Sequence, residues 1–349
     1  MGQMTRRDAV VLGGVAALGL LAPRSLYAQS DWANAAAVQE LHAKAKAERE
    51  AVLWGPQQRE LSWVPEEFNK RFPGITVNWA ADLSAPTKII AEARAGRYAV
   101  DVNINSLGGA HPIAERDLLG EIDWAMFGVA SSNVFHNGRA AATHNPVYGV
   151  VYNSNLVRKE ELPTTWDDLL AGRWKGRLVT SQFLFPRMLG FLAMEWGEAR
   201  TTEFARKLLD ANDVLVTRAP RESLLRTGER HMSIAEFVSG GQFWKQEGMP
   251  VEGHYLPPYP AVQFITARLK TAPHPNAATL LAGWLATDEA KRRREQLRFD
   301  GDLRAGSKSA IYADLRQRGG RLLIEDTGNM ATREDAYKKL SQLVSGRGK

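Results

Sequence analysis

Polar and aromatic side chains that could bind a ligand follow the apolar segments in the first third of this 349-residue sequence. Trp54 ends one apolar segment and Gln57 comes just after it. Asp82 follows a second segment, and Ser106 follows a third, where the free amides of a helix start could hold an anionic group. A structural role is the alternative for three of them: core packing for Trp54, a solvated loop for Asp82 and a helix cap for Ser106.

A second group of candidates lies in the later half of the chain. Arg187 follows Pro186 at an expected helix start, where its planar guanidinium would suit a carboxylate or phosphate. A surface arginine is the alternative. Glu236 and the following Ser239-Gly240-Gly241 mark another strand-to-turn junction. Arg187 and the helix starts favour an anionic ligand, whereas Asp82 and Glu236 would suit an organic cation, so the charge of the ligand stays open.

The motifs of the common enzyme classes are absent from the sequence. There is no GxSxG nucleophile elbow, no phosphate-binding loop, no HExxH zinc motif and no cysteine. Asp167 and Asp168 are adjacent, and adjacent side chains on a helix diverge by about 100°, so they would not share a substrate. We therefore expect no catalytic residue, no metal site and no cofactor, with the histidines serving as surface or capping residues. An exported hydrolase that uses scattered carboxylates is the alternative.

Composition bounds the class of protein further. With 44% hydrophobic and 24% charged residues, the chain can form two globular domains. Its formal net charge of +6 is spread along the sequence and does not indicate nucleic-acid binding. The densest basic run, residues 291–294 (KRRR), is expected to be a solvated helical face.

The N-terminus has the pattern of an export signal. Arg6 and Arg7 precede an apolar run over residues 9–22, and residues 26–28 (LYA) resemble a signal peptidase site. We assign residues 1–28 to a signal peptide cleaved near Ala28, with twin-arginine export as the interpretation and general secretion as the alternative. Because the sequence has no cysteine for lipid attachment, we expect a periplasmic protein that is not anchored to the membrane.

Strand and helix patterns alternate along the remaining chain, which predicts an α/β fold with parallel strands. Short strands are expected at residues 51–54, 75–79, 100–104, 178–181, 214–217 and 232–238. Helices are expected at residues 32–50, 61–71, 86–95, 110–118, 165–170, 187–196, 201–209 and 223–227, and the chain is expected to be mostly helical after residue 276.

Two further apolar strands, residues 145–155 and 261–266, lie between turn signals and are far apart in the sequence. The first has large side chains on both faces, so it should be buried on both sides. We interpret the two strands as crossovers between two lobes. Tyr148 lies in the first, and Tyr255 and Tyr259 lead into the second, so these tyrosines could line a cleft or pack in a hinge.

Six short motifs, taken in order, resemble extracellular solute-binding proteins of bacterial ABC importers, in the branch of iron, thiamine, phosphonate and polyamine binders. The motifs are residues 68–77 (FNKRFPGITV), 101–102 (DV) with 114–119 (AERDLL), 149–153 (GVVYN), 162–170 (LPTTWDDLL), 174–178 (WKGRL) and 272–278 (APHPNAA).

The resemblance implies a type II periplasmic binding protein, with two α/β lobes, a two-strand hinge and a ligand cleft that closes like a Venus flytrap. Lobe 1 would comprise residues 29–147 and 262–300, and lobe 2 residues 148–261 and 301–349. Ligand contacts are implied between Ser181 and Arg187. The implied partners are a small solute and an inner-membrane ABC permease, and the protein would be a monomer. Iron-binding relatives carry paired tyrosines where this chain has residues 239–244 (SGGQFW), so that mode of ferric binding is not expected.

Overall fold

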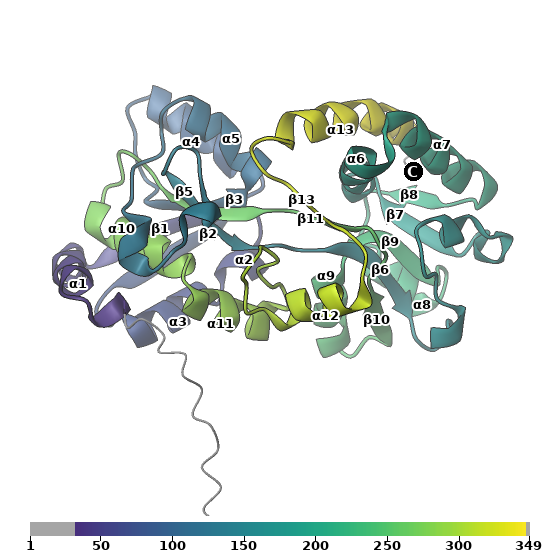
Figure 1. The fold of residues 1–349 in the computed structure, drawn as a ribbon, viewed down its shortest axis with the longest axis horizontal. Helices are drawn as coiled ribbons and strands as arrows, with labels where there is room; N and C mark the ends of the chain where they lie inside the picture. The colour runs from purple at the N-terminus through teal and green to yellow at the C-terminus, as the bar shows by residue number, and fades with distance from the viewer. Residues whose placement is uncertain (1–31, 347–349) are drawn as a thin grey trace, which may run out of the picture. The chain divides into compact units, whose positions relative to one another are not determined.

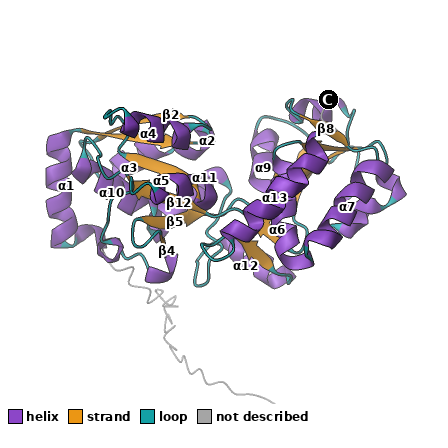
Figure 2. Ribbon diagram, turned by 90° about the horizontal axis from the view of Figure 1, so that it is seen from above, coloured by secondary structure: helices purple, strands orange, loops and turns teal. Residues whose placement is uncertain are grey.

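The structure is a computed structural model that describes residues 32–346, so the expected signal peptide lies outside the described residues. Helices pack around two main β-sheets (Figures 1 and 2). In the described part of the chain, no helix is long and apolar enough to cross a membrane.

The first sheet has six strands and combines parallel and antiparallel pairing. Its order is β2 (Thr76–Ala81), β1 (Glu50–Gly55), β3 (Val102–Ser106), β12 (Phe264–Arg268), β5 (Ala140–His144) and β4 (Val134–Phe135). The parallel pairing of β1 with β2 and β3 confirms the strand-helix-strand prediction. The associated helices are α1 (Ala36–Glu48), α2 (Gln58–Leu61), α3 (Val64–Arg71), α4 (Ala85–Arg94), α5 (Leu107–Glu115), α10 (Pro275–Leu285) and α11 (Asp288–Arg298).

The second sheet has five strands, in the order β10 (Val251–His254), β6 (Tyr148–Asn153), β9 (Met232–Phe237), β7 (Leu178–Ser181) and β8 (Leu215–Thr217). Strand β6 is buried along its whole length, which confirms the expectation of burial on both faces. The associated helices are α6 (Leu184–Trp196), α7 (Glu198–Ala211), α8 (Glu222–Thr227), α9 (Val238–Gln246) and α13 (Met330–Ser345). Residues 167–170, within the helix expected at residues 165–170, form a 3-10 helix.

The connections between the sheets are shorter than the sequence suggests. The first is the segment between His144 and Tyr148, because β6 itself lies within the second sheet. The second follows β11 (Tyr259–Ala261) and leads into β12. The two connections are paired, since the amide of Val262 donates to the carbonyl of Pro146 at 3.0 Å.

A third segment joins this region from the C-terminal part of the chain. Strand β13 (Leu322–Ile324) pairs in parallel with β11, after helix α12 (Ala310–Arg318). The side chain of Asn145 ties the segments together. Its Nδ2 donates to the carbonyl of Val262 at 3.2 Å, and its Oδ1 accepts from the amide of Leu303 at 2.9 Å. The sequence analysis predicted a mostly helical C-terminal part and did not identify β13.

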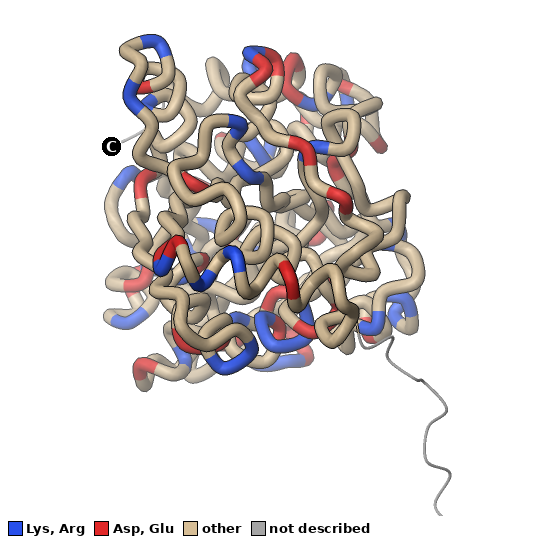
Figure 3. The backbone as a smooth tube through the Cα atoms, turned by 90° about the vertical axis from the view of Figure 1, so that its left-hand side faces the viewer, with Lys and Arg blue, Asp and Glu red and all other residues tan. Residues whose placement is uncertain are grey.

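The prediction that the basic run at residues 291–294 is a solvated face was wrong for Lys291 and Arg294, whereas Arg292 is exposed and Arg293 is partly exposed. Lys291 is buried and donates to Asp302 at 2.8 Å, and Arg294 is buried between two carboxylates. Burying charges is favourable only when they are paired, and the acidic partners come from other elements that the sequence pattern does not reveal. On the face seen in Figure 3, acidic and basic positions are interspersed.

Candidate functional site

The carboxyl ends of the parallel strands hold most of the predicted ligand-binding residues, as expected for an open α/β sheet. Those on the first sheet are largely engaged in local structure. Trp54 is half-buried and packs against a hydrophobic cluster, while Gln57 is exposed before helix α2. Asp82 accepts hydrogen bonds from the amide and hydroxyl of Ser84 and from Lys88. These bonds, that from Lys88 foremost, lower the pKa of Asp82 to about 2.

The start of helix α5, where free amides were expected, is occupied by groups of the protein itself. The hydroxyl of Ser106 accepts from the amide of Gly109 at 3.1 Å, which is an ordinary cap. The amide of Gly108 hydrogen-bonds to the buried carboxylate of Glu325. Burial raises the pKa of Glu325, and the nearby guanidinium of Arg333 opposes that effect at a distance of 2.8 Å. A resident carboxylate therefore takes the place of an external anion here.

On the second sheet, Tyr148 and Glu236 come together because β6 pairs with β9. Tyr148 is fully buried, its ring lies 4.5 Å from that of Phe237, and burial raises the pKa of its hydroxyl. Glu236 is paired with Arg221, which donates to Oε2 at 3.3 Å and also to Oε1. The hydroxyl of Ser233 donates to the same carboxylate at 2.9 Å. The acidic group is thus neutralised within the protein.

Ser181 and Arg187 differ in their availability. The hydroxyl of Ser181 accepts from the amides of Phe183 and Leu184 at 3.1 and 3.2 Å, so it caps the first turn of α6. Arg187 is exposed on that helix, and its guanidinium lies 5.8 Å from the centre of the Tyr337 ring. No carboxylate partner of Arg187 occurs among residues 32–346.

The two remaining tyrosines lie apart from these residues. Tyr259 is buried in the β11–β13 pair, opposite Leu322. Tyr255 lines a cavity of about 650 Å³. The walls of this cavity come from β10, from helix α9 and from helix α12, which contributes Arg318. Tyr148 and Tyr259 thus have packing roles, and only Tyr255 borders open space.

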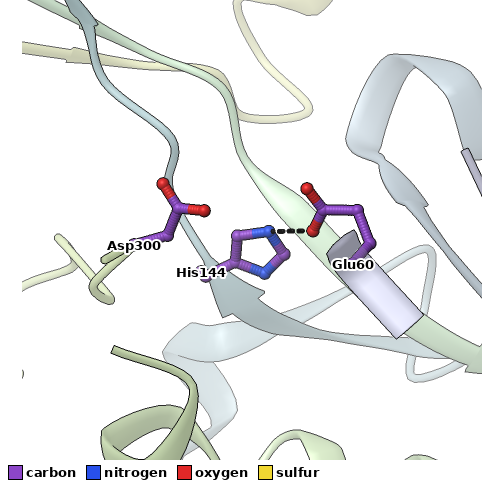
Figure 4. A group of neighbouring side chains, drawn as sticks. All are labelled: Glu60, His144 and Asp300. Carbon is purple, nitrogen blue, oxygen red and sulfur yellow. Dashed lines mark ion pairs between the residues drawn. The ribbon is translucent and has the colours of Figure 1, made fainter. Parts of the chain in front are cut away.

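A cluster of three buried side chains has the composition of a metal site. Glu60, His144 and Asp300 present ligand atoms that lie within 4.8 Å of one another (Figure 4). However, Arg294 donates to Glu60 at 2.5 Å and to Asp300 at 3.1 Å. The guanidinium already balances the carboxylate charge, so this cluster is an ion-pair network.

Burial and the neighbouring charges set the protonation states of the side chains in this network. Burial alone would raise the pKa of Glu60, but the charge of Arg294 and the contact with His144 hold it well below its usual range. Burial and Arg294 lower the pKa of His144, so the imidazole is neutral at neutral pH. The expectation that His144 is a surface or capping residue was therefore wrong.

Sequence reasoning missed several charged residues near the strand ends. Arg221 follows β8, where the position after a predicted strand could have identified it. Arg59 follows β1 in the same way. Glu325 and Arg333 carried no such signal, because β13 was not predicted and their partners lie far away in the sequence.

Several solved structures share the fold of this chain. Iron-bound HitA from Pseudomonas aeruginosa superposes with a TM-score of 0.68 at 16% sequence identity, covering 84% of this chain and 99% of that chain. Apo ferric ion-binding protein A of Pasteurella haemolytica superposes with a TM-score of 0.65 at 17% sequence identity, covering 85% of this chain and 97% of that chain. The substrate-binding protein of an ABC transporter from Agrobacterium tumefaciens superposes with a TM-score of 0.68 at 17% sequence identity, covering 86% of this chain and 96% of that chain. These likenesses confirm the predicted type II periplasmic binding fold.

Part of the sequence also matches a family model. Residues 127–220 match the model for the bacterial extracellular solute-binding protein family, which confirms the resemblance inferred from the six motifs. The search of curated proteins finds no match to this chain.

Proposed function

We propose that this chain is the solute-binding receptor of an ABC importer, which captures a small solute and delivers it to an inner-membrane permease. The single observation that carries the proposal is the type II fold with paired connections between its two sheets. The match of residues 127–220 to the solute-binding family supports it independently. The partner set, a small solute and a permease, follows from that class.

The lobes proposed are residues 29–147 with 262–300, and residues 148–261 with 301–349. The assignment of β12 to the first sheet and of α13 to the side of α6 supports this division. The segments joined by Asn145 would form the hinge, and closure around the solute would bring the strand ends together. Export to the periplasm, cleavage near Ala28 and a monomeric, unanchored mature protein belong to the same proposal.

The hydrolase alternative has weaker support. A general acid or base must be able to reach its substrate in the protonation state that the reaction needs. At the strand ends, Glu236 is bound by Arg221, Glu325 is bound by Arg333, and Asp82 is bound by Lys88. These carboxylates have structural partners, which favours binding over catalysis.

We expect the solute to differ from that of the iron-bound relative. The first turn of α9 carries Ser239 and Gly240 in a region where paired tyrosines would be required for that mode of iron binding. We therefore propose a solute other than ferric iron held by paired tyrosines.

The test is small-angle X-ray scattering together with thermal unfolding, with and without a broad panel of solutes. A cognate solute should reduce the radius of gyration, and at about 100 times its Kd it should stabilise the protein by about 2.7 kcal/mol. Native mass spectrometry of the purified protein would identify a bound solute. If no solute in the panel reduces the radius of gyration or raises the thermal stability of the protein, the receptor function is contradicted.

A further inference from the structure

The first turn of helix α9 lies against Arg59, which belongs to helix α2 after the first strand. A Cβ atom placed on Gly240 would lie 3.3 Å from Nη1 of Arg59. The two residues come from elements associated with different sheets, at strand ends where a solute would bind. The guanidinium therefore reaches the start of α9 from the opposite sheet.

The start of α9 has no side-chain cap. The amide of Val238 donates to the carbonyl of Val147 at 3.0 Å, and Phe237 supplies no side-chain cap. The first amides of a helix have no partner within the helix and carry its positive dipole end.

Ser239 adds an independent observation. Its side chain is only 3% exposed, and its Oγ has no hydrogen-bond partner in the described structure. Helical side chains lean toward the N-terminus, so this hydroxyl is directed toward the first turn. A buried hydroxyl without a partner costs free energy, which a ligand at this position would recover.

Arg59 is also incompletely paired. Its Nε is buried without a hydrogen bond and lies 3.7 Å from the nearer carboxylate oxygen of Glu60. The other oxygen of Glu60 is bound by Arg294 at 2.5 Å. A guanidinium beside the positive end of a helix is unfavourable unless an anion lies between them.

We propose that an anionic group of the solute, a carboxylate or a phosphate, binds between the Arg59 guanidinium and the first turn of α9 at Ser239 and Gly240. This inference rests on the proposed receptor function and names the chemical class of its solute. Arg59 would donate charge-assisted hydrogen bonds, and the helix amides and the Ser239 hydroxyl would complete the shell. Glycine at position 240 lets the Arg59 guanidinium approach the backbone, because a Cβ there would lie 3.3 Å from Nη1.

The charge balance at the strand ends supports an anion over an organic cation. The acidic residues there, Glu236 and Glu325, are each bound by an arginine. By contrast, Arg187 has no carboxylate partner among residues 32–346, and Arg218 donates only to the neutral amide of Gln182 at 2.8 Å. Of these charged side chains at the strand ends, the ones without a partner of opposite charge are therefore the arginines.

The experiment is titration calorimetry of the exported protein with inorganic phosphate, citrate and putrescine, supported by scattering under the same conditions. Phosphate and citrate separate the two anion classes, and putrescine is the cation probe. We expect one of the anions to bind, Arg59→Gln to weaken its binding at least tenfold and Ser239→Ala to weaken it several-fold. Arg59→Lys should restore part of the loss. Arg206→Gln is the matched control, because it removes an exposed arginine of helix α7.

Two outcomes would overturn the inference. If putrescine binds with compaction and neither anion does, the anion site is refuted while the receptor function stands. If an anion binds equally to Arg59→Gln and to the unchanged protein, the position of the site is refuted. Absence of any binding or compaction across the three probes and the broader solute panel would refute both this inference and the receptor function.

Discussion

Replacing Arg294 with methionine should destabilise the protein far more than replacing its neighbour Arg293. Arg294 is buried and neutralises both Glu60 and Asp300, whereas the side chain of Arg293 is 39% exposed and pairs with Glu67. Removing one partner of a buried pair leaves an uncompensated charge and costs about 3–5 kcal/mol. Breaking the exposed pair should cost about 1 kcal/mol or less.

Thermal unfolding followed by tryptophan fluorescence would measure the difference. At about 2 °C per kcal/mol for a chain of this size, Arg294→Met should lower the Tm by about 6–10 °C. Arg293→Met should lower it by about 2 °C or less. The two substitutions remove the same charge from adjacent positions of one helix, so their difference reports the buried cluster alone.

The pH dependence provides a second test of the same reasoning. In the unchanged protein the pKa of Glu60 lies below its usual value of 4.5, so its stabilising effect is full above that pH and is lost as the pH falls. Without Arg294, burial should raise the pKa of Glu60, and protonation would remove the unpaired charge. The stability difference caused by Arg294→Met should therefore shrink between pH 7 and about pH 4.5. A loss equal to that of Arg293→Met, or one independent of pH, would refute this account.

Two further predictions concern packing and a second ion pair. A Cβ on Gly149 would lie 2.4 Å from the carbonyl oxygen of His254, so Gly149→Ala should cost about 1–3 kcal/mol in denaturant unfolding. Gly172→Ala, with no atom within 4 Å, should be neutral, and equal effects would contradict the packing argument. The hydrogen bond from Arg293 lowers the pKa of Glu67 to about 2, so its contribution is present above about pH 4.5 and declines toward pH 2. The stability gap between the unchanged protein and Glu67→Gln should narrow over that range, and a constant gap would show that the carboxylate charge is not involved.

Local sequence patterns were sufficient to predict many of the strands. The apolar runs predicted β1, β3, β7 and β9 within two residues, because a short buried strand is visible in its own sequence. Strand β5 (Ala140–His144) was missed because three of its residues are alanines, which do not favour strands. Strand β13 was missed because it is short and forms only by pairing with β11.

The site was predictable in part, for a similar reason. Glu236 and Ser181 could be placed because residues after strands share one edge of a sheet. Their partners could not be placed: Arg221 reaches Glu236 only through the tertiary fold, and Glu325 reaches helix α5 from a segment more than two hundred residues later in the chain. Pairing across such separations depends on the complete fold, which no local pattern encodes.

The position of β12 in the first sheet constrains when that sheet can form during synthesis. Strand β12 lies between β3 and β5, and it pairs with both. It leaves the ribosome only after all the strands of the second sheet have been made. A nascent chain that ends before residue 264 therefore leaves the inner edges of β3 and β5 without their shared partner. The first sheet therefore cannot be completed before all the strands of the second have been synthesised.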